Sequence, residues 1–154
     1  MLIGVISDTH GLLRRPALDA LRSCDHILHA GDVGGSDDAI LRALTQRAPV
    51  TAIRGNIDEG TWADRLPGIR SVELGGCRLF LIHNLRELDF DPAKRGVHVV
   101  ISGHTHKAKV ENRNGVLYFN AGSAGPRRFN LPITMGMLRI ENGSITPEVI
   151  TLVE

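Results

Sequence analysis

Cysteine, aromatic residues and excess charge of either sign are all scarce in this sequence. Two cysteines among 154 residues are too few for the disulfide framework of a small secreted protein. One Trp, one Tyr and four Phe argue against an aromatic binding platform. Because 18 Lys and Arg nearly balance 17 Asp and Glu, no strong overall field attracts nucleic acid or an anionic membrane.

Long apolar runs are also missing, which excludes a membrane-spanning helix. The first residues, Met1 to Ile6, lack the basic start and long apolar stretch of a signal peptide. We therefore expect a cytoplasmic protein. Its length suits a single domain over residues 1–154, with no linker and no cap domain. Glycine and histidine, by contrast, are abundant, with 17 and seven residues, and this favours chemistry at loop ends.

The first half of the chain alternates short apolar runs with helical patterns. We predict strands over 2–6, 26–30 and 50–53, and helices over 16–21 and 37–48. Such alternation is typical of parallel βαβ units. The second half is richer in strands, which we predict over 69–74, 78–83, 97–102, 107–111, 116–120, 134–140 and 144–152. Gly75-Gly76, Asn114-Gly115 and Asn142-Gly143 predict three hairpin turns.

Polar side chains cluster where the predicted strands end. They are Asp8, His10, Asp32, Asn56, His83, His104 and His106. Because the carboxyl ends of parallel strands form the ligand-binding edge of α/β sheets, these groups are expected to meet at one rim. Taken singly, each has a structural explanation as a helix cap, a turn or a core histidine.

Together, these groups suit metal chemistry. Carboxylates, imidazoles and an amide without a thiolate favour Mn, Fe, Ni, Co or Zn over a cysteine-rich structural zinc site. Seven ligands exceed one tetrahedral site and suit two ions that share a carboxylate. Two divalent ions, two carboxylates and one hydroxide would leave a charge of about +1, which attracts a phosphate ester.

The set Asp8-Thr9-His10, Gly31-Asp32, Gly55-Asn56, His83 and Gly103-His104-Thr105-His106 resembles, in order and spacing, the signature of calcineurin-like metallophosphoesterases. Ser7-Asp8-Thr9-His10-Gly11 and Asn120-Ala121-Gly122-Ser123 look like the small YfcE-like phosphodiesterase subgroup. The resemblance covers residues 3–123.

The resemblance implies an α/β four-layer sandwich of two packed mixed sheets flanked by helices. It also implies two metal sites. Asp8, His10, Asp32 and His106 would hold the first ion, and Asp32, Asn56, His83 and His104 the second. A hydroxide bridging the ions would attack the phosphorus in line with the leaving group. Manganese is our first choice, with Ni, Co, Fe or Zn as alternatives.

The sequence departs from the superfamily at Ile57, where a histidine usually assists the leaving group. Ile57 cannot donate a proton. Asp58 then becomes a candidate catalytic acid, although a turn carboxylate is the simpler interpretation. Asn84, Arg127 and Arg128 are candidate substrate contacts together with Asn56, because amides and planar guanidinium groups bind phosphate oxygens. His29 lies close enough to Asp32 to support a metal ligand.

These features predict a metal-dependent phosphoric ester hydrolase, a phosphodiesterase that acts on a small or exposed phosphodiester. The alternatives are a phosphomonoesterase or protein phosphatase, and a binding module like the retromer scaffold subunit with little catalysis. We expect no extended nucleic-acid surface and no membrane partner, since the net charge is only +1. The resemblance is also compatible with a homo-oligomer.

Overall fold

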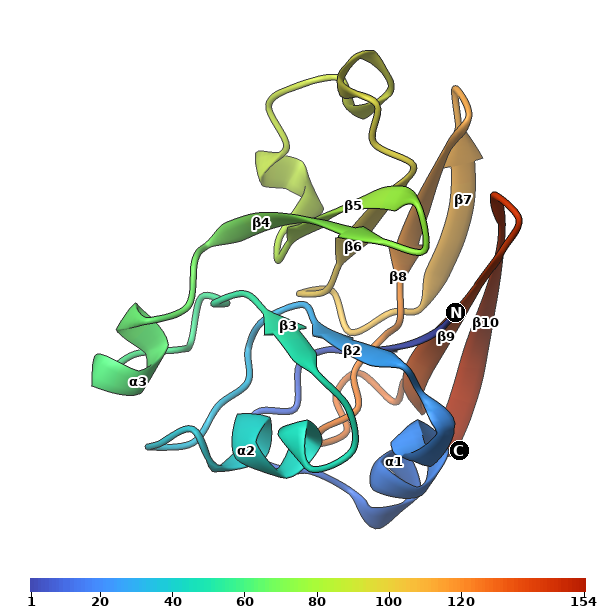
Figure 1. The fold of residues 1–154 in the computed structure, drawn as a ribbon. Helices are drawn as coiled ribbons and strands as arrows, with labels where there is room; N and C mark the ends of the chain where they lie inside the picture. The colour runs from blue at the N-terminus through green and yellow to red at the C-terminus, as the bar shows by residue number, and fades with distance from the viewer.

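Two mixed β-sheets packed face to face form the centre of the computed structural model, which describes residues 1–154 (Figure 1). The first sheet has the order β10-β9-β1-β2-β3, and the second β4-β5-β6-β8-β7. The strands of the first sheet are β1 (Leu2–Ile6), β2 (His26–His29), β3 (Val50–Ala52), β9 (Ile133–Glu141) and β10 (Ser144–Val153). Those of the second are β4 (Ile69–Leu74), β5 (Cys77–Ile82), β6 (Val99–Ser102), β7 (Lys109–Arg113) and β8 (Val116–Asn120).

Each sheet contains parallel strands, and their shared direction determines where the loops after these strands lie. β1, β2 and β3 run parallel, and the β9–β10 hairpin joins β1 in antiparallel fashion. In the second sheet β5, β6 and β8 run parallel, between antiparallel edge strands β4 and β7. The carboxyl ends of β1, β2 and β3 therefore lie at one edge of their sheet, and those of β5 and β6 at one edge of theirs.

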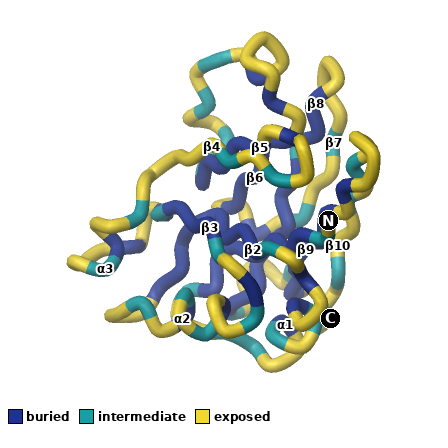
Figure 2. The backbone as a smooth tube through the Cα atoms, viewed as in Figure 1, coloured by how far each residue is buried: buried dark blue, intermediate teal, exposed yellow.

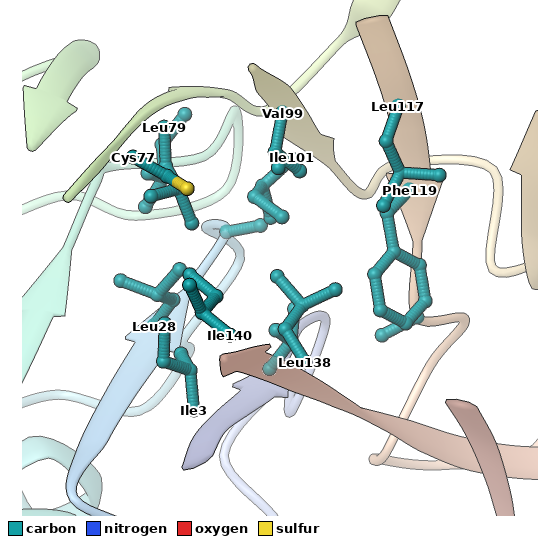
Figure 3. Packing of buried hydrophobic residues seen from close by; sticks show 14 of the residues in the cluster. Ile3, Leu28, Cys77, Leu79, Val99, Ile101, Leu117, Phe119, Leu138 and Ile140 are labelled. Carbon is teal, nitrogen blue, oxygen red and sulfur yellow. The ribbon is translucent and has the colours of Figure 1, made fainter. Parts of the chain in front are cut away.

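The main core fills the space between the two sheets (Figure 3). Ile3, Val5 and Leu28 of the first sheet face Leu79 and Ile101 of the second, and all five are fully buried. Burial is concentrated in the central strands and in the loops that follow β1, β2 and β8, whereas β4, β7 and β10 are mostly exposed (Figure 2). A core of this size holds the two sheets, and therefore their loops, in a fixed relation.

Short helices cover the outer face of the first sheet. They are α1 (Arg15–Ala20), which continues into the 3-10 turn η1 (Leu21–Ser23), and α2 (Ala39–Thr45). Ala17, Leu21, Ile40 and Leu44 pack there against the sheet. The outer face of the second sheet is covered by the segment that carries the 3-10 turns η2 (Leu85–Glu87) and η3 (Pro92–Arg95).

This arrangement confirms the predicted four-layer sandwich, with one outer layer made of 3-10 turns instead of α-helices. α3 (Thr61–Asp64), which the sequence pattern did not predict, lies on the connection from β3 to β4. None of the helices is both long and apolar enough to cross a membrane.

The three predicted hairpins are confirmed by their backbone angles. Both residues of each turn have positive φ, from 51° at Asn142 to 80° at Gly76. Two consecutive left-handed residues make the turn that matches the twist of paired strands, and Gly and Asn adopt this conformation most readily. The second helix is shorter than predicted, because α2 runs only from Ala39 to Thr45, whereas α1 has the predicted length and begins one residue earlier.

Candidate metal centre

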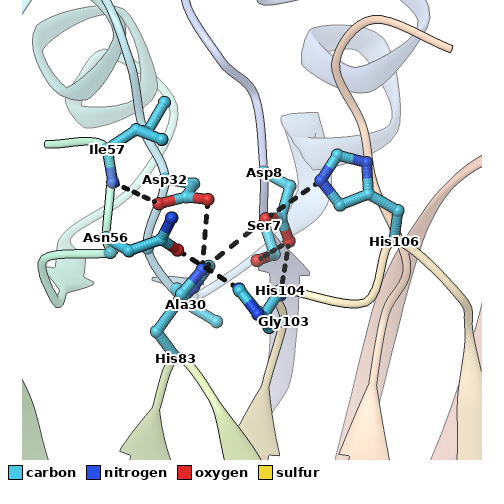
Figure 4. A network of polar contacts seen from close by, with 12 residues as sticks. Ser7, Asp8, Ala30, Asp32, Asn56, Ile57, His83, Gly103, His104 and His106 are labelled. Atoms are coloured by element: carbon cyan, nitrogen blue, oxygen red, sulfur yellow. Dashed lines mark hydrogen bonds and ion pairs between the residues drawn. The ribbon is translucent and has the colours of Figure 1, made fainter. Parts of the chain in front are cut away.

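All seven predicted ligands meet at the rim where the two sheets' parallel strands end (Figure 4). Asp8 and His10 follow β1, Asp32 follows β2 and Asn56 lies beyond β3. The second sheet supplies His83 after β5, and His104 and His106 after β6. The site therefore joins loops that are up to about a hundred residues apart in sequence, and the packing of one sheet on the other positions them.

The seven side chains form two groups. Asp8, His10 and His106 make the first, and Asp32, His83 and His104 make the second, with possible ligand atoms within 4.8 Å of one another in each. Asn56 joins the second group, because its Oδ1 lies 3.2 Å from His104 Nδ1.

Asp32 faces both groups. Its Oδ2 lies 3.1 Å from His83 Nε2 and 3.5 Å from His10 Nε2. Asp8 is placed similarly, with its Oδ1 3.5 Å from His106 Nε2 and 3.7 Å from His10 Nε2. The two groups therefore adjoin, and a carboxylate shared between them is available.

Unpaired polar atoms in the interior test whether metal ions fit here. Four buried side-chain atoms of the site have no hydrogen-bond partner, namely Asp8 Oδ1, His10 Nε2, His83 Nε2 and His106 Nδ1. Every ion pair of Asp8 and Asp32 is with a histidine, and none is with Lys or Arg. Buried carboxylates and imidazoles without such partners are costly unless a cation completes them, so the residues present fit divalent ions.

The contacts of His83 are the clearest local sign that a cation fits this site. Its Nδ1 lies 2.7 Å from the carbonyl oxygen of Ala30, to which it can only donate. In the neutral ring Nε2 then carries a lone pair, yet it faces the Asp32 carboxylate at 3.1 Å. Two acceptors at that distance require a proton or a metal ion between them. A backbone carbonyl that orients a ligand histidine in this way is typical of metal sites.

The pKa shifts of Asp8, Asp32 and His83 fit a site that binds a cation. Burial raises the pKa of Asp8, but contacts with His10, His106 and Ser7 outweigh this effect and bring the pKa below its usual range. Burial likewise opposes ionisation of Asp32, and contacts with His83 and the Ile57 amide lower its pKa overall. Burial lowers the pKa of His83, and Asp32 more than restores it. In the absence of metal, the raised pKa of His83 therefore favours a proton on this ring beside the Asp32 carboxylate.

Backbone strain is concentrated on the ligands. Five of them adopt left-handed φ angles, 56° at Asp8, 45° at His10, 55° at Asp32, 73° at His104 and 64° at His106. Non-glycine residues in this region cost of order 1–2 kcal/mol each and persist where the surrounding structure enforces them. The loops are thus held in shapes that aim side chains at the rim.

Several side chains outside the ligand set hold these loops. Ser7 Oγ donates to Asp8 Oδ2 at 2.6 Å, and Ser123 Oγ donates to the Asp8 carbonyl at 3.0 Å. Asn120 Nδ2 donates to the Gly103 carbonyl at 3.0 Å and fixes the loop that carries two ligand histidines. The sequence pattern assigned no role to these residues. Two positions were informative, because Ser7 directly precedes the ligand Asp8, and Asn120 and Ser123 lie at and just after the end of β8.

Asp58 lies buried behind the site with its carboxylate fully engaged. It accepts hydrogen bonds from the backbone amides of Val33, Gly34 and Gly55, at 3.1, 2.8 and 3.0 Å. Asp58 therefore ties the Gly55-Asn56 loop to the loop after Asp32. This placement matches the turn-carboxylate reading and gives Asp58 a positioning task.

His29 connects the loop after β1 with the loop after β2. Its Nδ1 accepts from the Gly31 amide at 3.1 Å, so Nε2 carries the hydrogen and donates to Thr9 Oγ1, also at 3.1 Å. The Thr9 hydroxyl in turn donates to the Val33 carbonyl. Both ring nitrogens are thus used in the neutral form, and complete burial lowers the pKa of His29 to about 4.

This burial predicts an acid-sensitive fold. The pKa of His29 is 6.5 when unperturbed and about 4 in the folded chain. Between these two pKa values the unfolded chain therefore binds a proton at His29 that the folded chain does not bind. The contribution of neutral His29 to the free energy of unfolding is fully present above pH 6.5 and is lost as pH falls towards 4. We expect metal-free wild type to lose about 3 kcal/mol more unfolding free energy over this range than His29→Gln, measured by urea denaturation. Parallel pH profiles for the two proteins would contradict this role for His29.

The predicted substrate contacts lie at different distances from the rim. Asn84 borders the site, and its Oδ1 accepts from the Arg86 amide at the start of η2. Arg127 instead donates to the carbonyls of Leu131, at 2.9 Å, and Glu154. Arg128 is exposed in the same loop.

Comparison with known proteins bears on this site. The family model described as the calcineurin-like phosphoesterase superfamily domain matches residues 1–143. The chain belongs to this superfamily. A probable metallophosphoesterase of Methanothermobacter thermautotrophicus is 35% identical over 162 residues, covering 97% of this chain and 92% of the relative. The predicted family is therefore confirmed, and metal-dependent phosphoester chemistry is the family context for the ligand groups.

Solved structures show the same fold. A novel archaeal phosphodiesterase aligns with a TM-score of 0.72 at 24% identity, covering 97% of this chain and all (100%) of that one. YfcE, a phosphoesterase from E. coli, aligns at 0.67 and 23%, with 99% and 100% covered. Vps29 from Entamoeba histolytica, solved with Zn²⁺, aligns at 0.74 and 22%, with 99% of each chain covered. At these identities the likeness is one of fold alone.

Proposed function

We propose that this chain is a phosphodiesterase with two divalent metal ions, which hydrolyses small or exposed phosphodiesters. The metal part of the proposal rests on the two adjoining ligand groups and their four unpartnered buried atoms. Asp8, His10 and His106 would hold one ion, and Asn56, His83 and His104 the other, with Asp32 shared between them. When bound, the ions supply Lewis acidity, which lowers the pKa of water and offsets negative charge on phosphoryl oxygens.

The observation that carries diester specificity is the shape of the surface at His104. Two depressions, of about 960 and 380 Å³, meet there, and His104 and Asn84 line both. A phosphate held at the rim can therefore extend one ester arm into each. A monoester has only one arm and would leave the second depression unused.

The chain's own residues also limit how the leaving group departs. Ile57 lies at the exposed margin of the site and has no proton to give, although its amide donates to Asp32 Oδ1 at 3.1 Å. The Asp58 carboxylate already accepts hydrogen bonds from three backbone amides. The His83 ring is oriented by Ala30 and faces Asp32. The scaffold therefore orients and neutralises the phosphate and favours substrates with good leaving groups.

A direct test compares a diester and a monoester with the same leaving group. Metal-free protein is reloaded separately with Mn, Ni, Co, Fe and Zn, with Mn as our proposed ion. We expect kcat/KM for bis(p-nitrophenyl) phosphate to exceed that for p-nitrophenyl phosphate by at least about tenfold, or ~1.4 kcal/mol of transition-state stabilisation. The metal content of each sample is measured in parallel.

Two results would overturn the proposal. Faster hydrolysis of the monoester would identify a phosphomonoesterase. Failure to hydrolyse either compound, in samples that carry two ions per chain, would favour the alternative of a protein-binding module with little catalysis.

A further inference from the structure

The larger depression beside the metal centre is a groove on the outer face of the second sheet. It begins at His104 and Thr105 and runs along the edge strand β7 and its neighbour β8 as far as Arg113 and Tyr118. β7 and β8 lie side by side in the second sheet (Figure 1). Their cross-strand pairs Lys109–Asn120, Glu111–Tyr118 and Arg113–Val116 place alternate residues of both strands on this face. The turn η2 forms the opposite wall.

The groove concentrates positive charge that the chain as a whole lacks. Arg86, Lys107, Lys109 and Arg113 line it, against a single carboxylate, Glu111. The entire chain carries a net charge of only +1, so this local excess stands out. Glu111 pairs with Arg113 at 2.9 Å and with Lys109 at 3.3 Å, which holds both cations over the groove.

Aromatic surface accompanies the charge. Phe129 lines the groove and is 79% exposed, the largest exposure among the big apolar residues of the chain. Its φ of 57° shows that the loop holds it in a strained conformation. Tyr118 lies on the floor beneath the Arg113 guanidinium, at 4.8 Å from the ring centroid. An exposed ring beside a row of cations suits a ligand with a planar base and several negative charges.

The smaller depression differs in charge. Its lining includes one cation, Arg54, and one anion, Glu87, so it has no preference for an anionic arm. The two arms of a bound diester are thus distinguished by charge, and the more negative arm is directed into the larger groove.

We infer that this groove selects phosphodiesters in which one ester arm is a nucleotide that carries a further phosphate. The inference rests on the proposed phosphodiesterase function and specifies its substrate class. The further phosphate would lie among Lys107, Lys109 and Arg113, and the base would stack on Phe129. Because the charged lining is confined to β7, β8, η2 and the adjoining loops, the groove suits a short nucleotide and offers no extended track for a long nucleic acid.

The test compares thymidine dinucleotides with and without a 5′-phosphate. We expect kcat/KM of the loaded enzyme to be at least about tenfold higher for pTpT than for TpT. The double variant Lys109→Ala/Arg113→Ala should remove this difference, so that pTpT and TpT are hydrolysed with equal kcat/KM. The matched control is Arg22→Ala/Arg139→Ala, which removes two exposed, ion-paired cations outside the groove and should behave as wild type. Equal rates for pTpT and TpT in wild type would overturn the inference.

Binding to metal-free protein separates this inference from the proposed function. ADP should shift the amide NMR signals of residues 107–113 and 129, and the groove double variant should weaken its binding at least about tenfold. Phe129→Ala should weaken ADP binding and leave pyrophosphate binding unchanged. If bis(p-nitrophenyl) phosphate is not hydrolysed but ADP binds in this way, the catalytic proposal fails and the groove assignment stands. If ADP produces no shifts in the groove, the groove assignment fails whatever the enzyme hydrolyses.

Discussion

Asp32→Asn is expected to lower phosphodiester hydrolysis by about 1000-fold or more, equivalent to ~4 kcal/mol of transition-state stabilisation. Asp32 Oδ2 faces His83 at 3.1 Å and His10 at 3.5 Å, so this carboxylate is adjacent to both ligand groups. An amide of the same size keeps the acceptor for the Ile57 amide but removes the negative charge. Metal analysis should therefore find fewer ions per chain, and the metal-free variant should still fold.

The change is best compared with Asp37→Asn. Asp37 is exposed and accepts only a local hydrogen bond, from the Ala39 amide, so its neutralisation should leave metal content and rate at wild-type levels. Chelation provides a second readout that is independent of activity. Removing metal should lower the unfolding temperature of wild type and of Asp37→Asn much more than that of Asp32→Asn, because ligand binding stabilises only the state that binds it. If Asp32→Asn kept two ions and nearly full activity, the shared-carboxylate assignment would be wrong.

Features that depend on local sequence were predictable. The strand over 2–6 ends where it was expected, because an apolar run is followed at once by Ser7-Asp8. The Asn142-Gly143 and Gly75-Gly76 turns follow from the few residues that accept left-handed angles. The position of ligands at strand ends follows from parallel topology, which the alternation of strands and helices indicates.

Features that depend on distant contacts were not predictable in the same way. Asp58 gains its positioning role from the Val33 and Gly34 amides, which belong to another loop. The charged groove exists because η2 and Phe129, from distant parts of the chain, lie near the face of β7 and β8 that carries Lys109 and Arg113. Neither arrangement leaves a periodic signal in the sequence. The left-handed angles of His10 and His104 are similarly invisible, because histidine does not favour them and tertiary contacts impose them.

Gly55→Ala is expected to damage the second ligand group although it alters no ligand. A Cβ at Gly55 would lie 2.1 Å from Asp32 Oδ1 and 2.2 Å from the Asp32 backbone nitrogen. The backbone nitrogen has little room to move, because it belongs to the strained turn after β2. The loop must therefore shift and carry Asn56 away from His104, from which it is now separated by 3.2 Å. We expect a loss of about 1–3 kcal/mol in stability and a rate at least about 100-fold lower.

Gly68→Ala is the matched control for this variant. Both glycines have ordinary φ angles, but a Cβ at Gly68 would meet nothing within 4 Å, so metal content and unfolding free energy should stay unchanged. Metal titration then distinguishes local damage from general destabilisation. Damage at the second group should weaken the second ion more than the first, which keeps Asp8, His10 and His106 as ligands. Equal weakening of both ions would show that the shift spreads through Asp32, which faces the two groups and would then couple them.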